Sequence, residues 1–130
     1  MSVFIGCEES QAVCQAFRDL GQEAYSCDIQ DCSGGRPEWH IQGDIEEAIK
    51  LGSIFDGKPW DFIGLHCPCT AIAVSGNRWY GTGMPMHQQR IDSVKWIEKV
   101  WSLAVQHCDR VYLENPVGVL NRSSSVFPKP

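Results

Sequence analysis

Cys69 stands where a catalytic thiol would be expected, at the end of the tetrapeptide His66-Cys67-Pro68-Cys69. An apolar run of strand length, Phe62 to Leu65, stops at this tetrapeptide, and a proline both ends strand pairing and stiffens the following turn. The turn is therefore expected to hold Cys69 at the mouth of a sheet. With a histidine and Arg78 near it in sequence, the Cys69 thiolate could be stabilised for nucleophilic attack. The alternative for any single cysteine is a buried structural thiol.

A second segment that could take part in catalysis is Glu114-Asn115-Pro116-Val117, which begins 45 residues after Cys69 and ends another apolar run. Pro68-Cys69, followed by Ser75-Gly76 and Arg78, resembles the catalytic loop of the cytosine-C5 DNA methyltransferases. Leu113-Glu114-Asn115 resembles the Glu-Asn-Val motif of the same family. The resemblance is nearest to small phage-type members and covers the chain from Val3 to about Val117.

This resemblance implies a reaction in which Cys69 attacks C6 of cytosine while Glu114 holds the N3 edge. Asn115 would fix the Glu114 carboxyl group, and Arg78 would approach the carbonyl oxygen of the base or the target phosphate. The methyl group would come from S-adenosylmethionine and pass to C5. A target cytosine in duplex DNA would have to leave the base stack to reach the thiol.

The chain departs from the family pattern at several positions. Cys67 replaces a second proline, which leaves open which thiol is nearer the substrate, although the position of Pro68 favours Cys69. Thr70, Ile72 and Ala73 stand where glutamine, phenylalanine and serine are common. The later arginine-rich motif, target-recognition domain and closing helix of the large enzymes have no counterpart. We therefore expect a methyltransferase-like domain over residues 1–117 and a tail or truncated segment over residues 118–130.

Hydrophobic periodicity predicts an α/β protein with alternating strands and helices. The expected strands are Val3 to Gly6, Glu23 to Cys27, Trp39 to Gln42, Trp60 to Leu65 and Arg110 to Leu113. The expected helices are Ala12 to Leu20, Ile45 to Leu51 and Ile91 to His107. This order predicts a Rossmann-like class I methyltransferase fold with a mostly parallel sheet of about five strands, lacking the C-terminal part of the usual fold.

The residues expected to bind the cofactor directly follow the predicted strands, where ligands of parallel sheets bind. Asp28 comes 22 residues after Gly6, close to the ~20 that separate a nucleotide-binding turn from the acidic residue on a ribose. A generic strand-helix-strand unit would explain this spacing about as well. Asp44 is either the N-cap of the next helix or, because Gly43-Asp44-Ile45 resembles the family's Gly-Asp-Ile segment, a contact to the adenine amino group. The full predicted cofactor set is Gly6, Cys7, Glu8, Glu9, Asp28, Asp44 and Pro68.

Composition argues against some classes of protein. The 130 residues carry a formal charge of -5, which counts against strong DNA binding because non-specific affinity comes from Lys and Arg on phosphates. No apolar run approaches the ~20 residues of a membrane-spanning helix, and the N-terminus lacks the pattern of a signal peptide. Seven cysteines without a disulfide pattern indicate free thiols and a cytoplasmic location, the host cytoplasm if a phage encodes the chain. Zinc bound by His66, Cys67 and Cys69 with Cys27 and Cys32 is a minor alternative.

Two functions of different classes therefore remain open. The first is a minimal cytosine-C5 DNA methyltransferase. The second is a catalytically inactive, methyltransferase-like binding protein that acts through a protein partner, as in phage-host interaction. A sheet that lacks the sixth and seventh strands has an exposed edge, so we expect a homodimer to be favourable under either reading.

Overall fold

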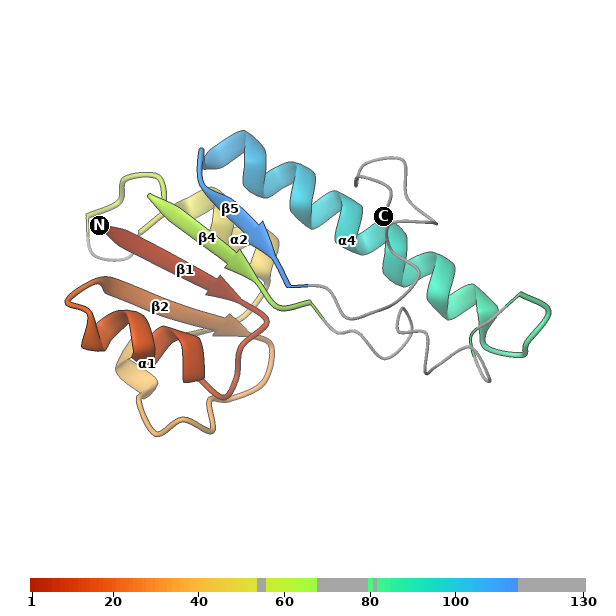
Figure 1. Ribbon diagram of the computed structural model, residues 1–130, viewed down its shortest axis with the longest axis horizontal. Coiled ribbons are helices and arrows are strands. Elements are labelled where there is room, and N and C mark those ends of the chain that lie inside the picture. Colours follow the sequence, from red (N-terminus) through yellow and green to blue (C-terminus); the bar gives the residue numbers. More distant parts are fainter. Residues whose placement is uncertain (54–55, 68–79, 81, 115–130) are drawn as a thin grey trace.

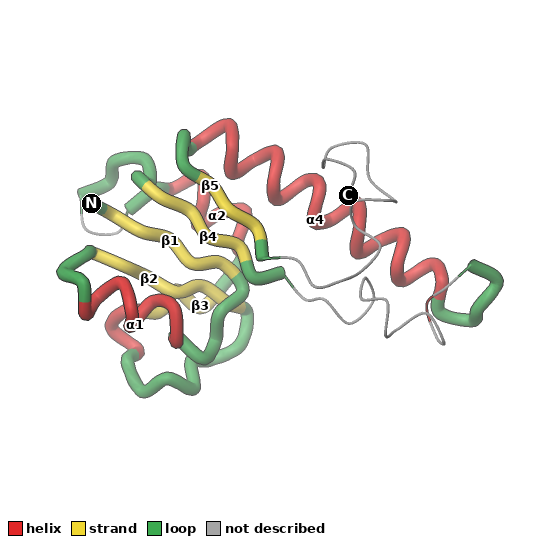
Figure 2. The backbone as a smooth tube through the Cα atoms, viewed as in Figure 1, coloured by secondary structure: helices red, strands yellow, loops and turns green. Residues whose placement is uncertain are grey.

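The computed structural model describes residues 1–53, 56–67, 80 and 82–114, which form a five-stranded parallel sheet with helices on both faces. The strands lie in the order β3-β2-β1-β4-β5 (Figures 1 and 2). Their bounds are Ser2–Gly6 (β1), Glu23–Asp28 (β2), His40–Gln42 (β3), Phe62–Leu65 (β4) and Val111–Leu113 (β5). The helices are Ala12–Asp19 (α1), Ile45–Leu51 (α2) and His87–His107 (α4), and a short 3-10 helix, Pro37–Trp39 (η1), precedes β3. The predicted α/β class and five-stranded parallel sheet are therefore confirmed.

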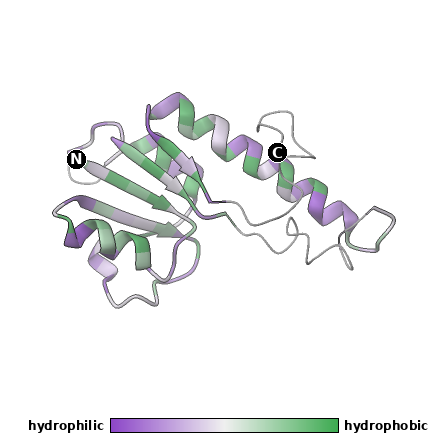
Figure 3. Ribbon diagram, in the orientation of Figure 1, coloured by the Kyte–Doolittle hydropathy of each residue, from purple (hydrophilic) through white to green (hydrophobic). Residues whose placement is uncertain are grey.

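Two separate clusters of buried side chains cover the two faces of the sheet. On one face, Phe17 of α1 packs with Val3 and Ile5 of β1. On the other face, Phe4 of the same strand packs with residues of α2 and α4 such as Ile49. Successive side chains of β1 therefore contribute to the two clusters in turn, as expected of a strand buried on both faces. Apolar residues dominate the strands, whereas α4 alternates apolar and polar residues along its length (Figure 3).

The switch point of the sheet lies between β1 and β4. The chain moves from β1 outward through β2 to β3, then crosses back to place β4 on the other side of β1 and β5 beyond it. All described strand pairs are parallel, so their carboxyl ends lie along one edge of the sheet (Figure 1). Ligands of such folds bind beyond this edge, next to the switch point.

Several predicted boundaries were wrong by a few residues. The helix expected from Ile91 begins at His87, because its first turn is polar and gives no apolar repeat to mark it. Trp39 belongs to η1 rather than to β3, and β5 begins at Val111. The strand expected from Trp60 begins at Phe62. Trp60 is instead a buried anchor whose indole N–H donates to the Ala48 carbonyl of α2 at 3.0 Å.

Helix α2 has the predicted bounds, and the side chain of Asp44 caps it by accepting a hydrogen bond from the Glu46 N–H at 2.8 Å. Within the described ranges, no helix is both long enough and apolar enough to cross a lipid bilayer.

Gln11 organises the connection between β1 and α1, which the sequence did not predict. Its side chain is fully buried, and its backbone is left-handed with φ 62°. The amide nitrogen donates to the Arg36 carbonyl at 2.8 Å and to the Ser26 hydroxyl at 3.2 Å, and the amide oxygen accepts from the Arg36 N–H at 3.1 Å. The turn-rich segment that contains Gly34 is thereby tied to the start of α1.

Replacing Gln11 with alanine should lower the free energy of unfolding by about 2 kcal/mol, because buried backbone and hydroxyl groups lose their partners. Gln15→Ala is the matched control, since the Gln15 side chain makes one part-buried hydrogen bond among the described residues, to the Gly34 carbonyl at 2.9 Å. Urea denaturation of both variants measures the difference. Equal losses in the two variants would contradict the role assigned to Gln11.

Candidate functional site

The carboxyl edge of the sheet gathers most of the described residues that the sequence singled out. Cys7 follows β1, Asp28 ends β2, and Glu114 follows β5. The backbone continues the ladder beyond the strands: the His66 N–H donates to the Gly6 carbonyl at 3.0 Å, and the Glu114 N–H donates to the Leu65 carbonyl at 2.9 Å. The sheet therefore fixes the backbone of these positions and not only their order.

A cavity of about 380 Å³ opens at this edge, on the side of α2 and α4. This volume falls within the ~300–1,000 Å³ of small-molecule sites. Apolar side chains form much of its wall, and the Asp28 carboxylate lies at the end of β2. The described lining residues are Cys7, Cys27, Asp28, Ile29, Gln30, Gly43, Ile45 and Trp96. An apolar wall with one acidic group suits a ligand that combines a flat ring with hydroxyl or cationic groups.

Two predicted cofactor residues, Cys7 and Asp28, line this cavity, and the other described members of the set have different positions. Gly6 lies against Ile45, whose Cδ1 would clash with a Cβ at that position, so the missing side chain of Gly6 allows close packing at the rim of the cavity. Asp44 lies between two lining residues, and its carboxylate caps α2. Of the two readings of Asp44, the helix cap is confirmed and the adenine contact stays a prediction.

The Glu8 carboxylate is turned into α1 and is not among the described residues that line the cavity. One oxygen accepts from the Val13 N–H at 2.6 Å and the other from the Cys14 N–H at 3.0 Å. These bonds satisfy donors that the first turn of a helix leaves free. The carbonyl of Glu9 accepts from the Ser33 N–H at 2.8 Å. Glu8 and Glu9 therefore shape the loop that carries Cys7.

Cys7 and Cys67 form a hydrogen-bonded thiol pair at the switch point. The Cys67 thiol donates to the Cys7 sulfur and lowers the pKa of Cys7, while burial and the charge of Asp28 act in the opposite direction. The same bond, together with burial, raises the pKa of Cys67. Cys7 also has φ 61°, a left-handed conformation rare outside glycine. The held backbone and the donated hydrogen bond favour thiolate character at Cys7, beside the cavity.

Glu114 makes its side-chain contact with His66, the residue that follows the neighbouring strand. Its Oε2 lies 2.5 Å from Nδ1 of His66, and Nε2 of the same ring lies 2.7 Å from the Tyr112 hydroxyl. The Glu114 side chain is 68% exposed, whereas that of His66 is 18% exposed. A carboxyl group, an imidazole and a phenol are therefore joined in one hydrogen-bonded row that ends at an accessible carboxyl group.

Gly64 makes room for this row. It pairs with Tyr112 in the register of β4 and β5, and a Cβ at Gly64 would lie 2.5 Å from two carbons of the Tyr112 ring. The ring can therefore lie across β4 and reach His66. The sequence reasoning placed His66 near the thiol but missed its contact with Glu114 and the part of Tyr112. The available signal was that His66 and Glu114 each come directly after a strand.

Four predicted site residues, Pro68, Cys69, Arg78 and Asn115, lie outside the described residues, as does the segment 118–130. Their predicted roles remain predictions, as does the pairing of Cys69 with Glu114. Within the part of the chain that the structure describes, no group of three or more His, Cys, Asp or Glu side chains is arranged to hold a metal ion.

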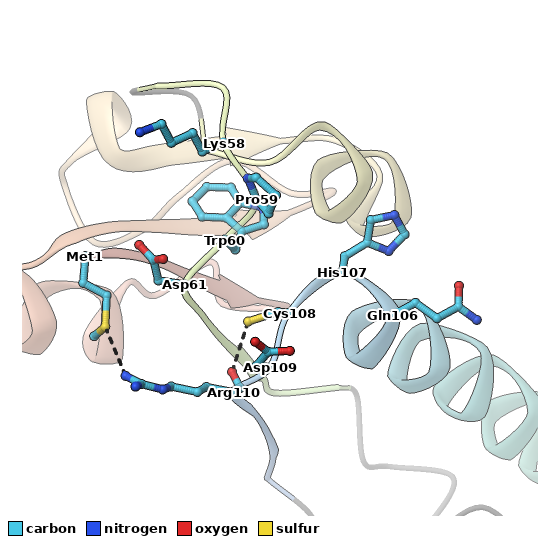
Figure 4. Close-up of a pocket in the computed structure, with 10 residues that line it drawn as sticks. All are labelled: Met1, Lys58, Pro59, Trp60, Asp61, Gln106, His107, Cys108, Asp109 and Arg110. Carbon is cyan, nitrogen blue, oxygen red and sulfur yellow. Dashed lines mark hydrogen bonds between the residues drawn. The ribbon is translucent and has the colours of Figure 1, made fainter.

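A larger hollow of about 650 Å³ lies at the opposite, amino-terminal edge of the sheet (Figure 4). Several of its polar groups already have partners. Asp61 accepts from the Ser2 N–H at 2.8 Å, and the Cys108 thiol donates to the Arg110 carbonyl at 3.4 Å. Since ligands of parallel sheets bind at the carboxyl edge, the smaller cavity is the candidate site.

Alkylation should distinguish Cys7 from the buried thiols. Burial is the main cause that raises the pKa of Cys14 to about 11 and of Cys27 to about 12, so iodoacetamide at neutral pH should modify Cys7 ahead of both. Cys67→Ala removes the donor and should slow Cys7 labelling by at least about threefold, whereas Cys67→Ser keeps a hydroxyl donor and should slow it less. Peptide mass mapping over time measures the rates. Labelling of Cys7 no faster than that of Cys27 would contradict the assignment.

Alkaline pH should destabilise the protein through Tyr112. Burial, with the charges of Glu8 and Glu114, raises the pKa of Tyr112 to about 12, whereas an unfolded tyrosine titrates near ~10. Between these values the unfolded chain loses a proton that the folded chain keeps, so the free energy of unfolding falls as pH rises. Urea denaturation at several pH values should show a shallower fall for Tyr112→Phe than for the wild type. Parallel curves would exclude this linkage.

Comparisons with protein-family models, with curated proteins and with solved structures returned no match for this chain. The case for a function therefore depends on the site itself and on the motifs of the sequence.

Proposed function

We propose that this protein transfers a methyl group from S-adenosylmethionine to C5 of cytosine in DNA, through a covalent adduct with Cys69. The observation that carries this proposal is the position of Glu114: an accessible carboxyl group at the carboxyl edge of the sheet, hydrogen-bonded to His66, with a small-molecule cavity farther along the same edge. Cys69 follows β4 by only four residues, so the chain keeps the thiol close in sequence to this edge.

The residue chemistry follows from the weak nucleophilicity of C5. The Cys69 thiolate forms a bond to C6, the C5–C6 π electrons move toward C4, and N3 takes up a proton from Glu114. The product is an enamine whose C5 can accept a methyl group. Loss of the proton from C5 then expels the thiolate and restores the aromatic ring, and N3 returns its proton to Glu114.

The cavity beside β1 and β2 fits the methyl donor in volume and in chemistry. Ile45 and Trp96 offer apolar surface for an adenine ring, and the Asp28 carboxylate suits ribose hydroxyls. When bound there, S-adenosylmethionine supplies an activated methyl group on a sulfonium centre. Cys7 lies in the same wall and is hydrogen-bonded to Cys67. Cys67 precedes the proposed nucleophile by two residues in the sequence.

A second candidate function is favoured by the charge of the chain. A formal charge of -5 gives little general attraction to phosphates, which suits a methyltransferase-like binding protein acting through a protein partner. That protein needs neither a cofactor nor an adduct, so the same experiments separate the two.

Trapping on DNA that contains 5-fluorocytosine tests the enzymatic proposal. Fluorine at C5 blocks the elimination that releases the thiol, so wild-type protein with S-adenosylmethionine should form a complex that survives denaturing electrophoresis. Cys69→Ser should form none, because a serine hydroxyl is a far weaker nucleophile. Cys67→Ser is the matched control and should still form the adduct.

Two other outcomes have distinct meanings. An adduct lost in Cys67→Ser but kept in Cys69→Ser would move the nucleophile to Cys67. No adduct with any form, together with no heat of binding when S-adenosylmethionine is titrated into the protein, would overturn the proposal in favour of the binding protein.

A further inference from the structure

The sheet itself places His66 beside Glu114. The parallel register of β4 and β5 pairs Gly64 with Tyr112 and Leu65 with Leu113. The next residue along each strand is His66 or Glu114. The Glu114 N–H still donates to the Leu65 carbonyl at this step. The imidazole-carboxyl contact is thus an extension of the strand pairing and not an encounter between two mobile loops.

Both nitrogens of the imidazole are engaged, which fixes the plane of the ring. Nδ1 faces Oε2 of Glu114 at 2.5 Å and Nε2 faces the Tyr112 hydroxyl at 2.7 Å. The rings of His66 and Tyr112 meet edge to face, with centroids 5.6 Å apart and planes at 84°. A hydroxyl group either donates or accepts, so Tyr112 can satisfy Nε2 whether or not that nitrogen carries a proton.

The row of Tyr112, His66 and Glu114 can exist with two different numbers of protons. With neutral His66 and ionised Glu114, Tyr112 donates to Nε2 and Nδ1–H donates to the carboxylate. One added proton leaves both hydrogen bonds in place: Nε2–H now donates to Tyr112, and the proton between Nδ1 and Oε2 belongs to either group. The row can therefore take up and release one proton without breaking a contact.

We propose that His66, whose ring is oriented by its hydrogen bond with Tyr112, supplies Glu114 with the proton that N3 of cytosine receives during attack by the thiolate. An exposed glutamate is ordinarily an anion at neutral pH, and an anion has no proton to offer N3. The proton shared between Nδ1 and Oε2 passes through Glu114 to N3, which leaves His66 neutral and Glu114 a carboxylate, and it returns to the row when the thiolate leaves. This inference rests on the proposed methyl transfer, and His66 acts through Glu114 as a positioning residue.

Among the described residues, few ionisable groups lie near the imidazole. Glu114 and Tyr112 contact it from β5 and its end, and Glu8, from the connection between β1 and α1, acts electrostatically on Tyr112. The Tyr112 hydroxyl stays neutral across the working range, because burial and these charges raise its pKa to about 12.

The test compares methyl transfer by the wild type and His66→Asn across pH. The asparagine amide can donate to Glu114 as Nδ1–H does, but it cannot give up a proton. We expect the variant to be slower by about 100-fold near pH ~8 and by no more than about threefold near pH ~5.5, where hydronium is about 300-fold more abundant and can supply the proton in place of His66. Loss of the Cys69 thiolate at low pH affects both proteins alike and cancels in the ratio. His107→Asn, the same change at the other end of the sheet, should match the wild type.

The outcomes separate this inference from the proposed function. If the wild type methylates DNA and the ratio of the His66→Asn rate to the wild-type rate is constant across pH, the role of His66 is structural. That result overturns the proton supply and leaves the proposed methyl transfer in place. A wild type inert on DNA overturns both.

Discussion

The parallel pairing of β4 with β1 on one side and β5 on the other is the constraint on which the site depends. It aligns the carboxyl ends of three strands, so that residues far apart in sequence become neighbours one or two positions beyond the last paired residues. The contact between Cys7 and Cys67 joins the ends of β1 and β4, and the contact between His66 and Glu114 joins the ends of β4 and β5. Without the ladder, neither pair would have a fixed distance.

Alternation along β4 gives two adjacent residues two different partners. Phe62 contacts Phe17 of α1 and Tyr112 of β5, so this side of the strand faces α1. His66 meets the same Tyr112, whereas Cys67 belongs to the cluster of buried residues from α2 and α4. Two adjacent residues after β4 therefore face the Glu114 carboxyl group on one side of the sheet and the buried cluster under α2 and α4 on the other.

Sequence patterns were sufficient where the physical signal is local. Helix α2 was predicted at its observed bounds because an apolar repeat coincides with Asp44, a capping residue that stabilises the first turn. The start of α4 was missed because the residues from His87 onward are polar, and the helix is stabilised there without an apolar stripe. The carboxyl-edge location of Asp28 and Glu114 followed from strand order along the chain alone.

The contacts inside the site could not be predicted from the sequence, because they depend on which strands are neighbours. The partnership of His66 with Glu114 requires β4 beside β5, and that of Cys7 with Cys67 requires β1 beside β4. Local propensity does not determine that order. Gln11 illustrates a second limit: its left-handed backbone and its bond to Arg36, 25 residues away, leave no periodic trace in the sequence.

Exposure of Glu114 in the free protein bears directly on how the site would work. A carboxyl group that is 68% exposed is surrounded by water of high dielectric constant, which weakens its electrostatic contacts. A base inserted against it would displace that water, and the hydrogen bonds to His66 and to N3 would both strengthen in the drier site. The same insertion would disfavour a bare carboxylate and so favour the protonated form that N3 requires. Binding of the base and protonation of the Glu114 carboxyl group are therefore coupled through one desolvation step. The net charge favours a low overall affinity for DNA, but this affinity does not set the rate of the chemical step once the base is in place.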